Sequence, residues 1–293
     1  MQLNGVLVPI VTPFDEQGEL NVQALRELVA HFLEAGVGGI AACGTTGEYY
    51  ALSEAERETV LRTVRESIGD NALAIAGIND LSTAGVIRRA EQAKAMGYQL
   101  LMLAPPVYSL PGQREVLAYY REIASATDLP IILYNFPARV GVEIAVETVA
   151  ELAKIPNIVA IKESSGDFSR ALALLQLSDP GFQVVCGCDD QAADFLFWGV
   201  RAWISGAANV FPAEQARMIA AAEAEDWSRV RAMMRAMLPA IQDMESGDYN
   251  QKAKLGCSRH DIAVGDVRGP LQPLEAAAAA TFLDSLKRFA SNA

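Results

Sequence analysis

The sequence is poor in the residues that most often bind metals or form disulfides. Its 293 residues include two histidines, His31 and His260, and four cysteines, none of them in a C-x-x-C pair. Zinc sites and disulfide frameworks need such residues at short, repeated spacings. We therefore expect neither a metal site nor a disulfide framework.

Positive charge and long apolar runs are scarce as well. The chain carries 24 Lys and Arg against 36 Asp and Glu, a net charge of −12. Nucleic-acid binding needs clustered Lys and Arg, and a membrane span needs about 20 consecutive apolar residues. The N-terminus lacks the basic and apolar regions of a signal peptide. We expect a cytoplasmic protein that binds neither nucleic acid nor membranes.

Short apolar segments recur along the chain, each followed by a stretch with helical periodicity. Their composition hardly alternates between polar and apolar residues, as in strands buried on both faces, and no two-residue hairpin turn joins two of them. The expected strands are 5–11, 39–42, 72–77, 99–103, 131–135, 158–161, 183–186 and 202–205. This α/β pattern is typical of a (β/α)8 TIM barrel. The alternative, an open doubly wound sheet, usually has a glycine-rich nucleotide-binding loop after its first strand, and this sequence has none there.

The sequence beyond about residue 223 contains helical segments only, at about 227–245, 249–257 and 274–289. No further strand is expected there to join the barrel. We therefore predict a catalytic barrel domain, residues 1–223, followed by a C-terminal helical domain, residues 224–293.

Reactive side chains in such a barrel stand at the carboxyl ends of the strands, where they meet over one pocket. Lys162 follows the sixth strand, Tyr134 ends the fifth, and Thr45 lies in the loop after the second. Each has an ordinary explanation by itself: Lys162 marks a strand's exit into solvent, Tyr134 is a core residue, and Thr45 belongs to a tight turn. Neither histidine follows a strand, which argues against a histidine-based metal aldolase and a Ser-His-Asp triad.

Together these residues favour covalent catalysis by an amine. An unprotonated lysine attacks a ketone and loses water, and the resulting iminium withdraws electrons while a neighbouring C–C bond is made or broken. Burial among apolar strands favours the uncharged amine that this attack requires. Tyr134 can move the protons with Thr45 as a relay, and the backbone N–H groups of residues 44–47 suit a carboxylate.

Three segments resemble the signatures of the dihydrodipicolinate synthase and N-acetylneuraminate lyase superfamily, and the similarity extends over roughly the whole chain. They are Gly44-Thr45-Thr46-Gly47-Glu48, Tyr134-Asn135-Phe136-Pro137 and Ile161-Lys162-Glu163-Ser164-Ser165-Gly166-Asp167. The resemblance implies a lyase without metal or other cofactor that forms a Schiff base on Lys162, with Tyr134 for proton transfer and Thr45 and Thr46 as the relay and carboxylate-binding pair.

The same resemblance implies roles for further residues and for a partner subunit. Tyr108 matches a tyrosine that is lent to a neighbouring subunit's site, so we expect a homotetramer or a dimer. Arg139 matches an arginine that grips the carboxylate of a second substrate. Gly47 and Gly187 are expected to bind substrate, and the carbonyl group at Ile204 is expected to face it.

The sequence also departs from the biosynthetic synthases, at residues 77–81 (GINDL) and 249–254 (YNQKAK). The positions that match their lysine feedback site hold Tyr49, Tyr50, Glu54, Leu81 and Gly85, so we expect no feedback inhibition by lysine. The substrates expected first are pyruvate, or another 2-oxo acid, and an aldehyde of the aspartate-semialdehyde type.

Three alternatives stay open beside this expectation. The chain could be a catabolic 2-keto-3-deoxy sugar acid aldolase or dehydratase, or a 1-pyrroline-4-hydroxy-2-carboxylate deaminase. It could also be a non-catalytic paralogue that binds a 2-oxo acid, although the intact set of Lys162, Tyr134 and Thr45 argues against that.

Overall fold

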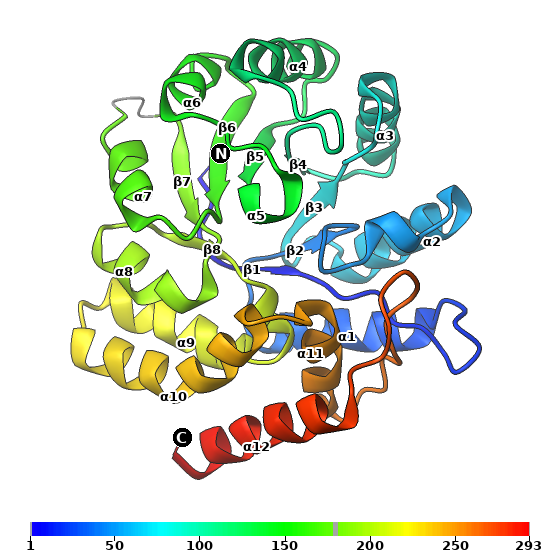
Figure 1. The fold of residues 1–293 in the computed structure, drawn as a ribbon, viewed down its shortest axis with the longest axis vertical. Coiled ribbons are helices and arrows are strands. Elements are labelled where there is room, and N and C mark those ends of the chain that lie inside the picture. Colours follow the sequence, from blue (N-terminus) through cyan, green and yellow to red (C-terminus); the bar gives the residue numbers. More distant parts are fainter. Residues whose placement is uncertain (1, 178–180, 293) are drawn as a thin grey trace.

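Eight parallel strands form a closed barrel in sequence order, with β8 paired to β1 (Figure 1). The computed structural model describes residues 2–177 and 181–292. The strands are β1 (Gly5–Pro9), β2 (Gly39–Ala42), β3 (Leu73–Gly77), β4 (Leu100–Leu103), β5 (Ile131–Asn135), β6 (Ile158–Glu163), β7 (Gln183–Cys186) and β8 (Ala202–Ile204). The predicted (β/α)8 barrel with C-terminal helices is confirmed.

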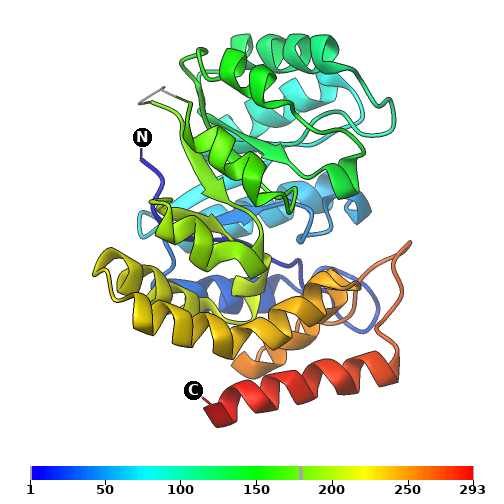
Figure 2. The ribbon, with the colours of Figure 1, turned by 60° about the vertical axis from the view of Figure 1, so that its left-hand side comes forward.

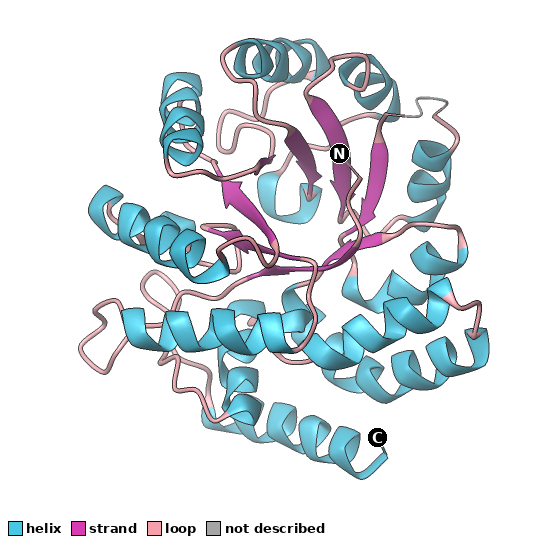
Figure 3. Cartoon of the chain, turned by 180° about the vertical axis from the view of Figure 1, so that it is seen from behind, coloured by secondary structure: helices cyan, strands magenta, loops and turns pink. Residues whose placement is uncertain are grey.

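Helices surround the strands on the outside of the barrel (Figure 3). They are α1 (Val22–Glu34), α2 (Glu54–Ile68), α3 (Thr83–Ala95), α4 (Gln113–Ser125), α6 (Val146–Leu152), α7 (Phe168–Leu175), α8 (Ala192–Phe197) and α9 (Pro212–Glu223). The short helix α5 (Pro137–Val140) and the 3-10 helices η1 (Tyr49–Ala51), η2 (Asp189–Gln191) and η3 (Gly206–Asn209) lie in the loops. Because these helices cover the sheet's outer face, both faces of each strand are buried, which explains why the strands lack polar alternation.

The boundaries of the strands differ most from expectation at the first and sixth strands, and β1 ends at Pro9 rather than at residue 11. β6 does not end before Lys162 but continues through Lys162 and Glu163. The reason is ladder pairing on both sides, since Lys162 lies opposite Tyr134 of β5 and Val185 of β7. Lys162 is therefore held inside a strand. Ser53 forms a capping box with Glu56 at the start of α2, and Asp167 caps α7.

The C-terminal helices pack along one side of the barrel, with α12 outermost (Figure 2). They are α10 (Trp227–Glu245), α11 (Tyr249–Gly256) and α12 (Ala276–Asn292), with η4 (Cys257–His260) following α11. The Phe289 ring of α12 packs 4.9 Å from that of Phe211, between centroids. The predicted domain boundary between residues 223 and 224 falls at the end of α9, just before the turn to α10. That the two parts are separate domains stays a prediction. No helix in residues 2–177 and 181–292 is long and apolar enough to cross a membrane.

A buried ion pair connects the C-terminal helices to the loop after β2. Lys254 of α11 lies 2.8 Å from the Glu48 carboxylate, Nζ to Oε1, and the two residues are 3% and 0% exposed. Lys254 Nζ also donates to the Asp266 carbonyl (2.7 Å), and the Arg268 backbone N–H donates to Glu48 Oε2 (2.9 Å). Burial lowers the pKa of Lys254, whereas Glu48 raises it. The pair thus fixes the loop at residues 44–48 against α11.

Replacing Lys254 with methionine should destabilise the fold strongly. The variant would leave the Glu48 carboxylate buried without its cation, a change that typically costs about 3–5 kcal/mol. Urea unfolding followed by circular dichroism measures the loss. Lys287→Met, which breaks an exposed pair with Asp284 on α12, is the matched control and should cost under about 1 kcal/mol. Equal losses in the two variants would contradict a structural role for the buried pair.

Candidate active site

A cavity of about 480 Å³ opens at the carboxyl ends of the strands and collects most of the predicted site residues. Strands β5 and β6, the loops after β2 and β7, and the region from the end of α10 to the start of α11 contribute to its wall. Its lining includes Lys162, Tyr134, Thr45, Thr46, Arg139 and Gly187, and also Ser164, Ser165, Cys188, Asp189, Asp190, Glu245 and Asn250. The barrel therefore brings together residues that lie up to about 200 positions apart in the chain.

Lys162 and Tyr134 form the centre of this cavity. They stand opposite each other on neighbouring strands, each only 6% exposed. Lys162 Nζ lies 4.2 Å from the centroid of the Tyr134 ring. Among the described residues no ion pair holds Lys162. Its amine thus faces the cavity free of a carboxylate, as a nucleophile needs to.

Gly187 is required by its closeness to the Lys162 side chain. A Cβ atom built on Gly187 would lie 2.1 Å from Ser164 Oγ and 2.8 Å from both Lys162 Cγ and the Glu163 carbonyl oxygen. Atoms do not approach that closely, so any larger residue would displace these parts of β6 and its loop, including the Lys162 side chain. Gly187 also lines the cavity, which leaves its predicted contact with substrate open.

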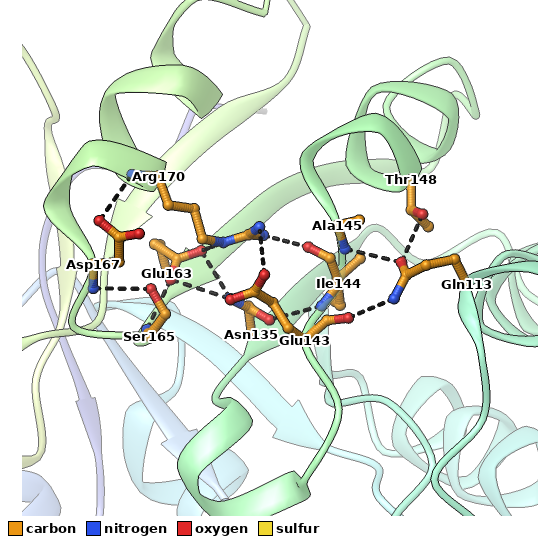
Figure 4. A network of polar contacts seen from close by, with 10 residues as sticks. All are labelled: Gln113, Asn135, Glu143, Ile144, Ala145, Thr148, Glu163, Ser165, Asp167 and Arg170. Atoms are coloured by element: carbon orange, nitrogen blue, oxygen red, sulfur yellow. Dashed lines mark hydrogen bonds and ion pairs between the residues drawn. The ribbon is translucent and has the colours of Figure 1, made fainter.

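A buried polar network behind the cavity fixes the ends of β5 and β6 (Figure 4). Both oxygens of the Glu163 carboxylate accept hydrogen bonds from Asn135 Nδ2, at 3.1 and 3.0 Å, and Arg170 Nε donates to Glu163 Oε2 at 3.0 Å. Side chains alternate along a strand, so Asn135 and Glu163 point away from the barrel while Tyr134 and Lys162 point inward. The network therefore sets the backbone positions of both inward side chains.

The same network holds the loop that follows α5. Asn135 Oδ1 accepts the backbone N–H of Ile144 at 3.0 Å, and the Arg170 guanidinium donates to the Ile144 carbonyl. Gln113 reaches this loop from α4 by donating to the Glu143 carbonyl at 2.7 Å. Helix α5, which was not predicted, runs from Pro137 to Val140, is capped by Gly141 with φ of 76°, and places Arg139 at the cavity.

The loop after β2 presents two threonines to the cavity. The Thr45 carbonyl accepts a hydrogen bond from Asn250 Nδ2 of α11 at 3.1 Å, and Thr46 is buried. Gly47 does not line the cavity, and its absent side chain makes room for the Ile10 carbonyl, which a Cβ would approach to 2.9 Å. Ile204 is fully buried in β8 and does not line the cavity either. Substrate contacts of Gly47 and Ile204 stay predictions.

Arg139 and Tyr108 differ sharply in position. Arg139 lines the cavity and its guanidinium lies 5.6 Å from the centroid of the Phe136 ring. Tyr108 lies outside the cavity lining and is 95% exposed, with φ of 70°. This chain therefore supplies Arg139 to its own cavity but not Tyr108.

The side of the cavity near β7 is acidic. Asp189 is buried and accepts hydrogen bonds from Trp203 Nε1 (2.9 Å), the Ala207 backbone N–H (3.0 Å) and the Tyr249 hydroxyl. Burial, reinforced by the Asp189 and Asp190 carboxylates, raises the pKa of Glu245 to about 7. The sequence analysis missed Glu245, because nothing in the sequence indicated that the end of α10 reaches over the barrel.

Comparisons with known proteins find similarity over almost the full chain. The model of the dihydrodipicolinate synthetase family matches residues 2–289. A 4-hydroxy-tetrahydrodipicolinate synthase from Exiguobacterium sp. is 34% identical over 285 residues, 97% of each chain. The synthase of Stenotrophomonas maltophilia is 37% identical over 277 residues, 94% of this chain and 93% of the relative.

Solved structures show the same fold. The 4-hydroxy-tetrahydrodipicolinate synthase of Methylacidiphilum fumariolicum SolV is similar with a TM-score of 0.95 at 29% identity, over 99% of this chain and 97% of that one. The dihydrodipicolinate synthase of Acinetobacter baumannii, determined in complex with pyruvate, has a TM-score of 0.95 at 30% identity, over 99% of both chains. The chain therefore belongs to the dihydrodipicolinate synthetase family of lyases, which work through a covalent lysine Schiff base and use no cofactor.

Proposed function

We propose that this chain is a class I lyase in which Lys162 forms a Schiff base with pyruvate, whose enamine then condenses with an aldehyde that carries a distal carboxylate, as aspartate semialdehyde does. The observation that carries the proposal is the position of Lys162, whose Nζ faces the cavity 4.2 Å from the centroid of the Tyr134 ring. The cavity, of about 480 Å³, has room for two small reactants. The synthases at 34–37% identity support the same reaction.

The reaction begins at the Lys162 amine and passes through an iminium and an enamine. The Lys162 amine adds to the C2 carbonyl of pyruvate, the oxygen leaves as water, and loss of a methyl proton converts the iminium to an enamine. The enamine carbon then attacks the aldehyde carbon, and water releases the product and regenerates the amine. Tyr134 lies against Lys162 and moves the protons of imine formation, with Thr45 as its relay. Thr46 and the backbone of residues 44–47 hold the pyruvate carboxylate.

Arg139 is the proposed partner of the distal carboxylate. Its planar guanidinium can donate two parallel hydrogen bonds to a carboxylate, and it lies on the β5 side of the cavity. A second candidate, a 2-keto-3-deoxy sugar acid aldolase or dehydratase, is favoured by the acidic β7 side. There Asp190 and Glu245 would accept hydrogen bonds from sugar hydroxyls and repel a carboxylate. The deaminase alternative gains no specific support from the cavity.

Tyr108 supports the proposal that the protein works as a homotetramer or dimer. Tyr108 and Leu110 are 95% and 60% exposed, and both have a positive φ, of 70° and 46°. Two exposed apolar side chains on a backbone in this sparsely populated conformation suit a surface that a second copy covers. The cytoplasmic location expected from the sequence likewise stays a prediction.

Pyruvate with borohydride should attach covalently to Lys162. Reduction of the imine traps the adduct, and mass spectrometry of the digested protein locates it. Lys162→Ala should show neither adduct nor turnover, whereas Lys154→Ala, at an exposed lysine, should keep both. A wild-type protein without an adduct would contradict the amine mechanism.

Replacing Arg139 with alanine should separate the two candidate substrates. For an aldehyde with a distal carboxylate, the loss of a charge-assisted hydrogen bond of about 1.5–3 kcal/mol should lower kcat/KM roughly 10–150-fold. An aldehyde without a carboxylate should change by less than about threefold. Steady-state kinetics on both aldehydes measures the difference, with Arg114→Ala, an exposed arginine on α4, as the control. Equal losses on both aldehydes, or none, would favour the sugar acid reaction.

A further inference from the structure

Tyr249 lines the cavity, but the reaction proposed above gives it no role. It is the first residue of α11, and its half-buried ring shares the cavity wall with Lys162. The ring stands against Gly206, at the end of β8. A Cβ atom built on Gly206 would lie 2.6 Å from Tyr249 Cε1 and 2.9 Å from Tyr249 Cζ. Tyr249 therefore closes the cavity on the side of β8, and the absent side chain of Gly206 leaves room for its ring.

The Tyr249 hydroxyl is fixed by a buried carboxylate. It donates a hydrogen bond to Oδ2 of Asp189, in the loop after β7. Asp189 also accepts the indole N–H of Trp203 at 2.9 Å and the backbone N–H of Ala207 at 3.0 Å. Burial and the Asp189 carboxylate raise the pKa of the Tyr249 hydroxyl well above its usual value, so this hydroxyl keeps its proton and stays a donor. The ring thus has a fixed position in the cavity wall.

The loop that holds Tyr249 also contacts the side chain of Lys162. Gly187 lies two residues before Asp189, and a Cβ atom on Gly187 would approach Lys162 Cγ to 2.8 Å. Gly187, Gly206 and Tyr249 line the same cavity as Lys162. The reactant that Tyr249 faces is therefore the one that binds to Lys162.

The geometry of an imine determines which part of that reactant meets Tyr249. The imine carbon is planar and bonded to the lysine nitrogen, to the carboxylate carbon and to C3. The nitrogen comes from β6, and the proposed carboxylate site is the loop after β2, so C3 points towards either β4 or β8. Thr45 and Tyr134 close the β4 direction and line a separate cavity of about 200 Å³ beyond them. C3 therefore points towards Gly206 and Tyr249.

We propose that Tyr249 is a specificity-determining residue that restricts the 2-oxo acid on Lys162 to pyruvate, an inference that rests on the Lys162 imine proposed above. C3 of pyruvate is a methyl group, which the space in front of the ring accepts. A longer 2-oxo acid carries a further carbon on C3, and this carbon would meet the ring. The ring already stands against the Gly206 backbone and cannot retreat in that direction. The new C–C bond therefore forms at a carbon without a branch.

Exchange of the C3 protons in D2O, followed by proton NMR, measures this preference, because exchange needs only the Lys162 enamine. The wild type should exchange pyruvate with a kcat/KM about 10–200-fold higher than that for 2-oxobutanoate, the range for one extra methylene in a fitted pocket. Tyr249→Ala should reduce this ratio to about threefold or less, because the extra carbon then takes the space of the ring. Spontaneous exchange of each acid, measured without protein, is subtracted.

Two further variants separate the ring from other effects. Tyr249→Phe keeps the ring and loses the hydrogen bond to Asp189, so its ratio should stay within about threefold of the wild-type ratio. Phe197→Ala removes an aromatic ring of α8 that is 64% exposed and lies outside the cavity lining, and it should keep the wild-type ratio. Circular dichroism of each variant confirms that it is folded.

Gly206→Ala tests the packing of the ring independently of the length of the substrate. In the wild type the added methyl group would push the Tyr249 ring into the cavity and lower kcat/KM for pyruvate exchange about tenfold. In the Tyr249→Ala background the methyl group meets no ring, so the same substitution should cost under about threefold. Equal costs in the two backgrounds would contradict the packing on which the proposal depends.

Three other outcomes would overturn the role of Tyr249. A wild type that exchanges 2-oxobutanoate as readily as pyruvate has no such restriction. An unchanged ratio in Tyr249→Ala would assign the restriction to other residues, and equal losses of selectivity in Tyr249→Phe and Tyr249→Ala would assign it to the Asp189 hydrogen bond rather than to the ring. A wild type that exchanges neither acid would instead contradict the proposed Lys162 imine.

Discussion

The buried carboxylate of Glu163 is the constraint on which the site depends. It accepts hydrogen bonds from Asn135 of β5, Arg170 of α7 and the backbone N–H of Ser165, all at 2.7–3.1 Å. A charged group buried this deeply is tolerated only when its oxygens are occupied, so these partners have little freedom to move. Because Asn135 and Glu163 directly follow Tyr134 and Lys162, a rigid outward layer fixes the inward pair that faces the cavity.

The C-terminal helices complete the site as well as packing beside the barrel. Asn250 of α11 donates to the carbonyl of Thr45, and Lys254 holds Glu48 at the end of the same loop. The last turn of α10 adds Glu245 to the wall. A barrel that ended at α9 would therefore lack one side of its cavity. It would also lack the contacts that hold the loop at residues 44–48.

The sequence predicts those parts of the molecule that follow from local periodicity and from barrel closure. Unalternated apolar segments predicted the strands, and parallel pairing then places Lys162 opposite Tyr134, whatever the details of the loops. Glu245 and helix α5 were missed, because their places depend on packing between segments far apart in the chain. The reason for a glycine at position 47 was also not predictable. The Ile10 carbonyl approaches this position closely, and no local sequence pattern reveals that contact.

The two sides of the cavity carry opposite charges, which affects the reactants that the cavity can bind. Arg139 stands on the β5 side, whereas Asp190 and Glu245 stand on the β7 side. A reactant with a carboxylate at one end and a carbonyl or hydroxyl at the other can satisfy both sides by orienting along that axis. Such an orientation would place its oxygen near Glu245 and its carboxylate near Arg139. The charges would thereby favour one orientation of the reactant over its reverse, because a reversed carboxylate would face the acidic groups on the β7 side.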